Sequence, residues 1–73
     1  MVTIEEKLAV AKGGIIHVCG GYFFGKTFEL SVEGGRDYLT IKDKEEKFVA
    51  IFPLVVVREV ILDKDNFAQL FLR

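Results

Sequence analysis

The chain has few of the residues that cross-link or anchor a small protein. It contains one cysteine, Cys19, one proline and no tryptophan among 73 residues. A single cysteine cannot form an intramolecular disulfide, which excludes the disulfide-rich secreted scaffolds and fits a reducing cytoplasm. The N-terminus shows no basic segment followed by an apolar one, so the sequence predicts no signal peptide.

Long apolar runs and an excess of one charge are also missing. The longest apolar run, 48–57, is interrupted by Pro53, whereas a membrane-spanning helix needs about 20 apolar residues. Ten basic and eleven acidic side chains leave a net charge of −1. Nucleic-acid binding usually depends on a basic surface that neutralises phosphates. We therefore expect a soluble cytoplasmic protein without a membrane partner, and the charge does not favour nucleic acid as a partner.

Apolar residues, by contrast, are abundant. They make up 51% of the chain and include seven phenylalanines. A domain of this size buries only about 60% of the surface that its unfolded chain exposes. One single domain, residues 1–73, therefore carries more apolar surface than its core can hide. The composition predicts a homo-oligomer, with another protein as the alternative partner.

A short helix is predicted at the N-terminus. Thr3 and Glu6 form a capping box, in which each side chain satisfies a free backbone N–H group. An apolar stripe follows at Ile4, Leu8 and Ala11. Gly13 suits the C′ position after the last helical turn. A short edge strand over 3–10 is the alternative interpretation.

Five strands are predicted from alternating or apolar runs between turn residues: 15–19, 22–33, 37–43, 47–52 and 54–62. Gly34 and Gly35 are typical of a two-residue hairpin turn. Leu39 and Ile41 are expected to face inward. The tail, 67–73, fits either a helix or a last strand, and no internal repeat is found. The pattern predicts a mainly β protein, a small five-stranded antiparallel barrel or rolled sheet with a short N-terminal helix.

This order of a helix before five strands resembles, in outline, the Sm-like and SH3-like barrels. The resemblance implies their fold and no function, because the chain lacks a basic RNA-contacting loop and an Arg-Gly pair near the last strand. Val57-Arg58-Glu59 stands there instead. An outline shared with a fold does not transfer its activity.

One chemical motif is present, at residues 20–27. Gly20, Gly25, Lys26 and Thr27 satisfy G-x-x-x-x-G-K-[ST], the phosphate-binding P-loop. In a P-loop the glycine-rich backbone holds phosphates, the lysine reaches the β and γ oxygens, and the hydroxyl binds Mg²⁺. The apolar run 60–62 before Asp63 could act as a Walker B strand. The motif predicts a minimal ATP or GTP binder as one alternative function.

The residues after the motif favour a different structure. A P-loop continues directly into a helix, but residues 27–33 alternate with a period of two, as in a half-buried strand. A parallel nucleotide-binding sheet also needs βαβ units of about 30 residues each. We therefore interpret Gly20, Gly21 and Gly25 as bends in a curved sheet and Lys26 as a solvated flank.

The remaining candidates for chemistry are few. His17 and Cys19 would share one face of a strand and can both ligate zinc, but a zinc site needs three or four ligands. They are better explained as core or interface residues, and the acidic doublets as solvated turns. Tyr22, Phe23, Phe24 and Phe28 could stack bases, although the core or a subunit interface explains them better without interleaved basic residues. Tyr22, Phe23 and Phe24 are the predicted interface residues.

The sequence thus predicts an interaction or assembly module that is not an enzyme and self-associates through apolar β surfaces. It predicts no catalytic residue, no metal site and no cofactor. A small nucleic-acid-binding barrel and the P-loop nucleotide binder remain as alternatives.

Overall fold

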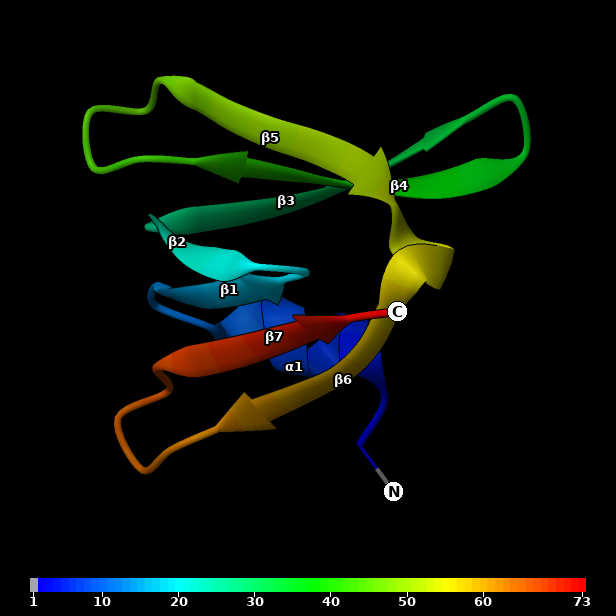
Figure 1. The fold of residues 1–73 in the computed structure, drawn as a ribbon. Helices are drawn as coiled ribbons and strands as arrows, with labels where there is room; N and C mark the ends of the chain where they lie inside the picture. The colour runs from blue at the N-terminus through cyan, green and yellow to red at the C-terminus, as the bar shows by residue number, and fades with distance from the viewer. Residues whose placement is uncertain (1) are drawn as a thin grey trace.

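The computed structural model describes residues 2–73. Of the N-terminal helix signature, predicted over residues 1–12, only Met1 lies outside the described residues. The chain forms two β-sheets, one helix and one short 3-10 turn (Figure 1). Sheet A has the strand order β2-β1-β7-β6, formed by β1 (Gly14–Val18), β2 (Gly21–Gly25), β6 (Val57–Leu62) and β7 (Ala68–Leu72). Sheet B has the order β3-β4-β5, formed by β3 (Thr27–Glu33), β4 (Arg36–Lys42) and β5 (Phe48–Pro53).

The predicted N-terminal helix is confirmed as α1 (Ile4–Val10). The Glu6 N–H donates to Thr3 Oγ1 over 3.1 Å, and the Thr3 hydroxyl donates to Glu6 Oε1 over 3.2 Å. The helix stops earlier than predicted, with Ala11 as its C-cap, so Gly13 lies beyond the C′ position at φ +132. Leu8 packs into the core and holds the short helix against the sheets.

The prediction of one strand over 22–33 is wrong. The structure divides it into β2 and β3, which belong to different sheets and meet at Lys26. At the corner, a Cβ on Gly25 would lie 2.5 Å from Cγ2 of Ile41 in sheet B. The Lys26 N–H donates to the Lys42 carbonyl over 2.8 Å, which fixes the start of β3 against β4.

The predicted mainly β fold with a short N-terminal helix is confirmed, whereas the closed barrel of five antiparallel strands is not found among the described residues. Seven strands form two sheets, and the described strands do not close into a barrel. Residues Leu54–Val56 form the turn η1, so only Val57–Leu62 of the predicted fifth strand is a strand. The ambiguous tail is the strand β7, which pairs in parallel with β1 and antiparallel with β6.

The core lies between the two sheets and α1. Its buried members are Leu8, Ile16, Leu39, Ile41, Leu54, Val57, Val60, Ala68 and Leu70. The inward orientation of Leu39 and Ile41 is confirmed, since both are fully buried. The strand β7 lies in the middle of sheet A, between β1 and β6. Its side chains Ala68 and Leu70 are buried on the inner face of that sheet.

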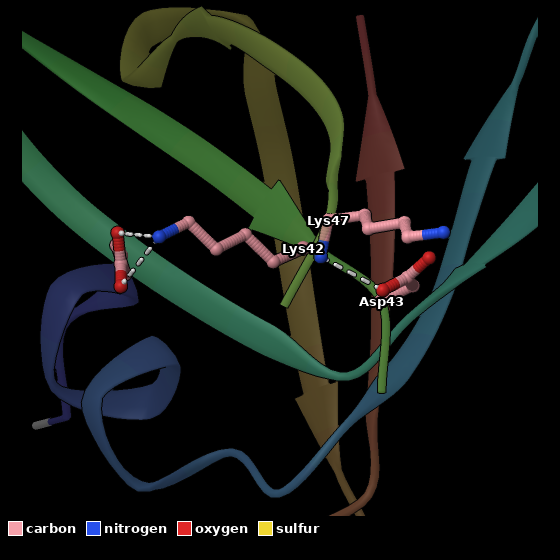
Figure 2. Close-up of polar contacts among 4 residues, drawn as sticks. Lys42, Asp43 and Lys47 are labelled. Atoms are coloured by element: carbon pink, nitrogen blue, oxygen red, sulfur yellow. Dashed lines mark hydrogen bonds and ion pairs between the residues drawn. The ribbon is translucent and has the colours of Figure 1, made fainter. Parts of the chain in front are cut away.

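Two hairpin turns repeat one hydrogen-bond pattern. Asp43 Oδ1 accepts from the N–H groups of Glu45 and Lys47, the latter shown in Figure 2. Asp63 Oδ1 accepts in the same way from the N–H groups two and four residues later. Glu46 and Asn66 occupy the same left-handed position, at φ 60 and 61. The two turns share only the Asp-Lys pair at their start, which is too short to be recognised as an internal repeat in the sequence.

The predicted hairpin turn at Gly34 and Gly35 is confirmed. Gly34 and Gly35, between β3 and β4, have φ values of 57 and 77. Positive φ at both central residues defines the type I′ turn that suits the twist of two antiparallel strands.

Candidate functional site

Three of the four P-loop residues, Gly25, Lys26 and Thr27, lie at the corner between the sheets. Gly20 lies in the turn before β2 at φ +88, and the crowded Gly25 admits no side chain. Lys26 Nζ donates to the Lys12 carbonyl over 3.1 Å, and Thr27 begins β3. The strand predicted after the motif is confirmed. The segment therefore does not present the helix N-terminus with which a P-loop binds phosphate.

A shallow depression of about 380 Å³ lies beside this corner. Its lining residues are Phe24, Gly25, Lys26, Asp43, Lys44 and Glu45. Two lysines and two carboxylates give it almost no net charge, so it has no electrostatic preference for phosphate.

Several aromatic side chains lie together on the outer face of sheet A, which is the face turned away from the core. Strand register places Tyr22 beside His17, and Phe24 beside Ile15. The parallel pairing continues the row from Ile15 to Gln69 and from His17 to Phe71, and β6 adds Glu59 and Ile61. We call this set, with Arg58, the aromatic face: Ile15, His17, Tyr22, Phe24, Arg58, Glu59, Ile61, Gln69 and Phe71.

Contacts within the aromatic face hold its side chains in place. The rings of His17 and Phe71 stack with centroids 4.6 Å apart and an interplanar angle of 4°. His17 Nε2 lies 3.2 Å from Gln69 Oε1. The Arg58 guanidinium carbon lies 5.7 Å from the centroid of the Phe71 ring, a cation–π contact. A surface ordered in this way loses less side-chain entropy when it is covered.

Tyr22 and Phe24, both on β2, are the most exposed large apolar side chains of this face. Tyr22 is 63% exposed and Phe24 is 62% exposed, and their rings meet edge-to-face with centroids 5.7 Å apart. Phe23 points to the opposite side of β2 and packs against the core. The structure thus places two of the three predicted interface residues on one surface and the third in the interior.

The two sequence candidates for a metal site do not come together. His17 lies on the aromatic face, whereas Cys19 is exposed in the turn after β1. No group of three or more potential metal-binding side chains occurs within residues 2–73. The acidic residues Glu5, Glu6, Glu45 and Glu46 are exposed.

A second open depression, of about 650 Å³, lies near the start of α1 and the end of β7. Arg36 and Arg73 both line it. Arg73 already donates to the main chain, from Nε to the Val55 carbonyl over 3.0 Å and from its N–H to the Val56 carbonyl over 2.9 Å. Asp37 and Glu5 face the same hollow and offset its positive charge.

The aromatic face could not be assembled from the sequence alone. Within each segment, the sequence indicates which residues share one face of a strand: 15 and 17, 22 and 24, and 69 and 71. That these segments lie side by side depends on the parallel β1–β7 pair, which joins residues more than fifty positions apart.

No family model, curated protein or solved structure matches the chain. Across residues 2–73, the one α-helix is far too short to span a bilayer.

Proposed function

We propose that the protein is a non-catalytic assembly module that self-associates through the aromatic face. The exposure of Tyr22 and Phe24 carries this proposal. Both rings lie on a sheet surface that no other described element covers. Burying apolar surface stabilises an association by roughly 25 cal/mol per Å² before the cost of ordering is subtracted.

The composition of the face supports a second copy of the chain as its partner. Aromatic side chains extend from its edge strand, with Tyr22 and Phe24 on β2, to its middle, where Phe71 stacks on His17. Aromatic residues are enriched in protein interfaces. Arg58 and Glu59 lie together on β6, at one border. A two-fold contact can place each of these opposite charges near the other in the second copy, because the same patch is used twice.

The test is the oligomeric state of a Tyr22→Ser/Phe24→Ser variant, measured by sedimentation velocity over a range of concentrations. We expect the wild-type protein to associate and the variant to dissociate at the same concentration. The matched control is Val32→Ser/Val55→Ser, which changes two residues with exposed fractions of 69% and 73% away from the aromatic face. A wild-type monomer at all concentrations would refute self-association, and equal weakening by the control would refute the aromatic face as its site.

A further inference from the structure

We propose that the free edge of β5 pairs with β5 of a second copy, antiparallel and with Ala50 on the two-fold axis. The contact joins two B sheets into one sheet of six strands. It deepens the proposed function by naming a second contact between copies, but its evidence lies on the opposite sheet. The two contacts can therefore fail separately.

The edge of β5 is open and uncharged. Within residues 2–73, β5 pairs only with β4, and Figure 1 shows it along the upper border of the molecule. Its residues 48–53, FVAIFP, include no charged side chain. Phe48 is 63% exposed, Val49 38% and Ile51 48%. An apolar edge of this kind is a template for another strand.

Two of the other three sheet edges, β6 and β3, carry charges that disfavour pairing, whereas β2 is uncharged and is restricted only at its end. On β6, Lys7 Nζ donates to the Val60 carbonyl over 3.0 Å, and Arg58 and Glu59 add charge. On β3, Glu29 and Glu33 are exposed. The end of β2 is packed against sheet B at Gly25. Charges at edges are a common means of preventing strand addition.

The backbone of β5 indicates which residues would form the new hydrogen bonds. Pro53 pairs with Tyr38 of β4, and proline is tolerated in a ladder where its nitrogen faces away from the neighbouring strand. The N–H and C=O of Ile51, two residues earlier, then also face the open side. Val49 has no partner on β4, because the register shifts there and the extra residue of a bulge is left unpaired.

The sequence of β5 is self-complementary around Ala50. Read in either direction, residues 48–52 give an aromatic ring, a β-branched residue, alanine, a β-branched residue and an aromatic ring. Antiparallel pairing centred on Ala50 sets Val49 opposite Ile51 of the second copy, which joins the unpaired residue of the bulge to a residue whose backbone groups face the open side. It also leaves Pro53, which cannot donate, outside the paired segment. Only the small Ala50 meets itself on the axis.

The register can be tested by disulfide trapping. In a Cys19→Ser background, Ala50→Cys places two thiols opposite each other, where paired Cα atoms are about 4.5–5.5 Å apart and a disulfide can form. We expect mild oxidation to give a covalent dimer that reductant separates. Ile51→Cys and Val55→Cys are matched controls, and the far-ultraviolet circular dichroism of each variant verifies folding. A dimer that forms faster through residue 51 or 55 than through residue 50 would overturn the proposed register.

A second variant tests the edge by adding a charge next to the axis. Adding Ile51→Lys to the Ala50→Cys variant introduces a charge beside Val49 of the second copy and should slow cross-linking at least about tenfold. An unchanged rate in a folded variant would overturn the proposal.

Combining the two sets of variants separates the two contacts. With both present, the wild-type protein should form even-numbered assemblies. Ile51→Lys alone and Tyr22→Ser/Phe24→Ser alone should each leave dimers, and together they should give monomers. If Tyr22→Ser/Phe24→Ser already gives monomers and Ala50→Cys does not cross-link, the β5 contact is refuted and the proposed function stands. If cross-linking occurs but that variant changes nothing, the aromatic face is refuted instead.

Discussion

Sheets A and B share a construction element but differ at their borders. Each contains a hairpin closed by the same aspartate-centred turn, at Asp63 in sheet A and at Asp43 in sheet B. Sheet A ends in β6, where Lys7 bonds the edge carbonyl of Val60. Sheet B ends in β5, whose edge has neither charge nor partner among the described residues. The turns set local strand pairing, whereas the borders decide which surfaces remain open to other molecules.

The largest effect is expected where the two sheets meet. Gly25→Ala would bring a methyl group to 2.5 Å from Ile41 Cγ2 and force the sheets apart. We expect a loss of about 1–3 kcal/mol in the free energy of unfolding, typical of an overpacked core. Urea denaturation measures it. Gly21→Ala on the same strand is the matched control, because its added Cβ meets nothing within 4 Å. Equal losses in both variants would mean that Gly25 is not held by the approach of sheet B.

An intermediate loss of stability is expected when the aspartate of either shared turn is replaced. Asp43→Ala and Asp63→Ala each remove an oxygen that accepts two backbone N–H groups. Each substitution should lower the free energy of unfolding by about 1–2 kcal/mol. The corresponding Asp→Asn substitutions should lower it less, because the amide oxygen can still accept the two hydrogen bonds. Thermal and urea unfolding of the four variants measure the costs. Clearly unequal losses for Asp43 and Asp63 would show that the sheets, and not the shared turn, determine its contribution.

The smallest effect is expected at the guarded edge. Lys7→Met keeps the apolar stem but removes the donor to Val60, at a cost of about 0.5–1.5 kcal/mol. Hydrogen exchange at β6 should quicken, and light scattering should show more association because the edge is now open. Lys7→Arg retains a donor and is the control. If Lys7→Met scatters light no more than Lys7→Arg, the lysine does not protect this edge.

Local sequence signals predicted the local structure well. The Thr3 cap, the Gly34-Gly35 turn and the inward side chains of Leu39 and Ile41 depend on neighbours in the sequence, and all are confirmed. The period-two pattern after Thr27 correctly predicted a strand where the P-loop motif required a helix.

Features that depend on distant partners were missed. Nothing local to Gly25 marks it as the contact with Ile41, so the corner at Lys26 was read as a continuous strand. The strand β7 was ambiguous because its seven-residue segment fits two periodicities. Its role became defined only by β1 and β6 on either side. The aromatic face, the candidate site, depends on the same distant pairing, so of its members only His17, Tyr22 and Phe24 were named in advance as interface candidates.

The position of β7 also constrains when this protein can fold during synthesis. Sheet B is continuous in sequence from 27 to 53, so its two hairpins can form while the rest of the chain is still being translated. Sheet A cannot, because its central strand consists of Ala68–Leu72. Until the ribosome has released these residues, β1 and β6 have no strand between them, so the edges that later pair with β7 stay unpaired.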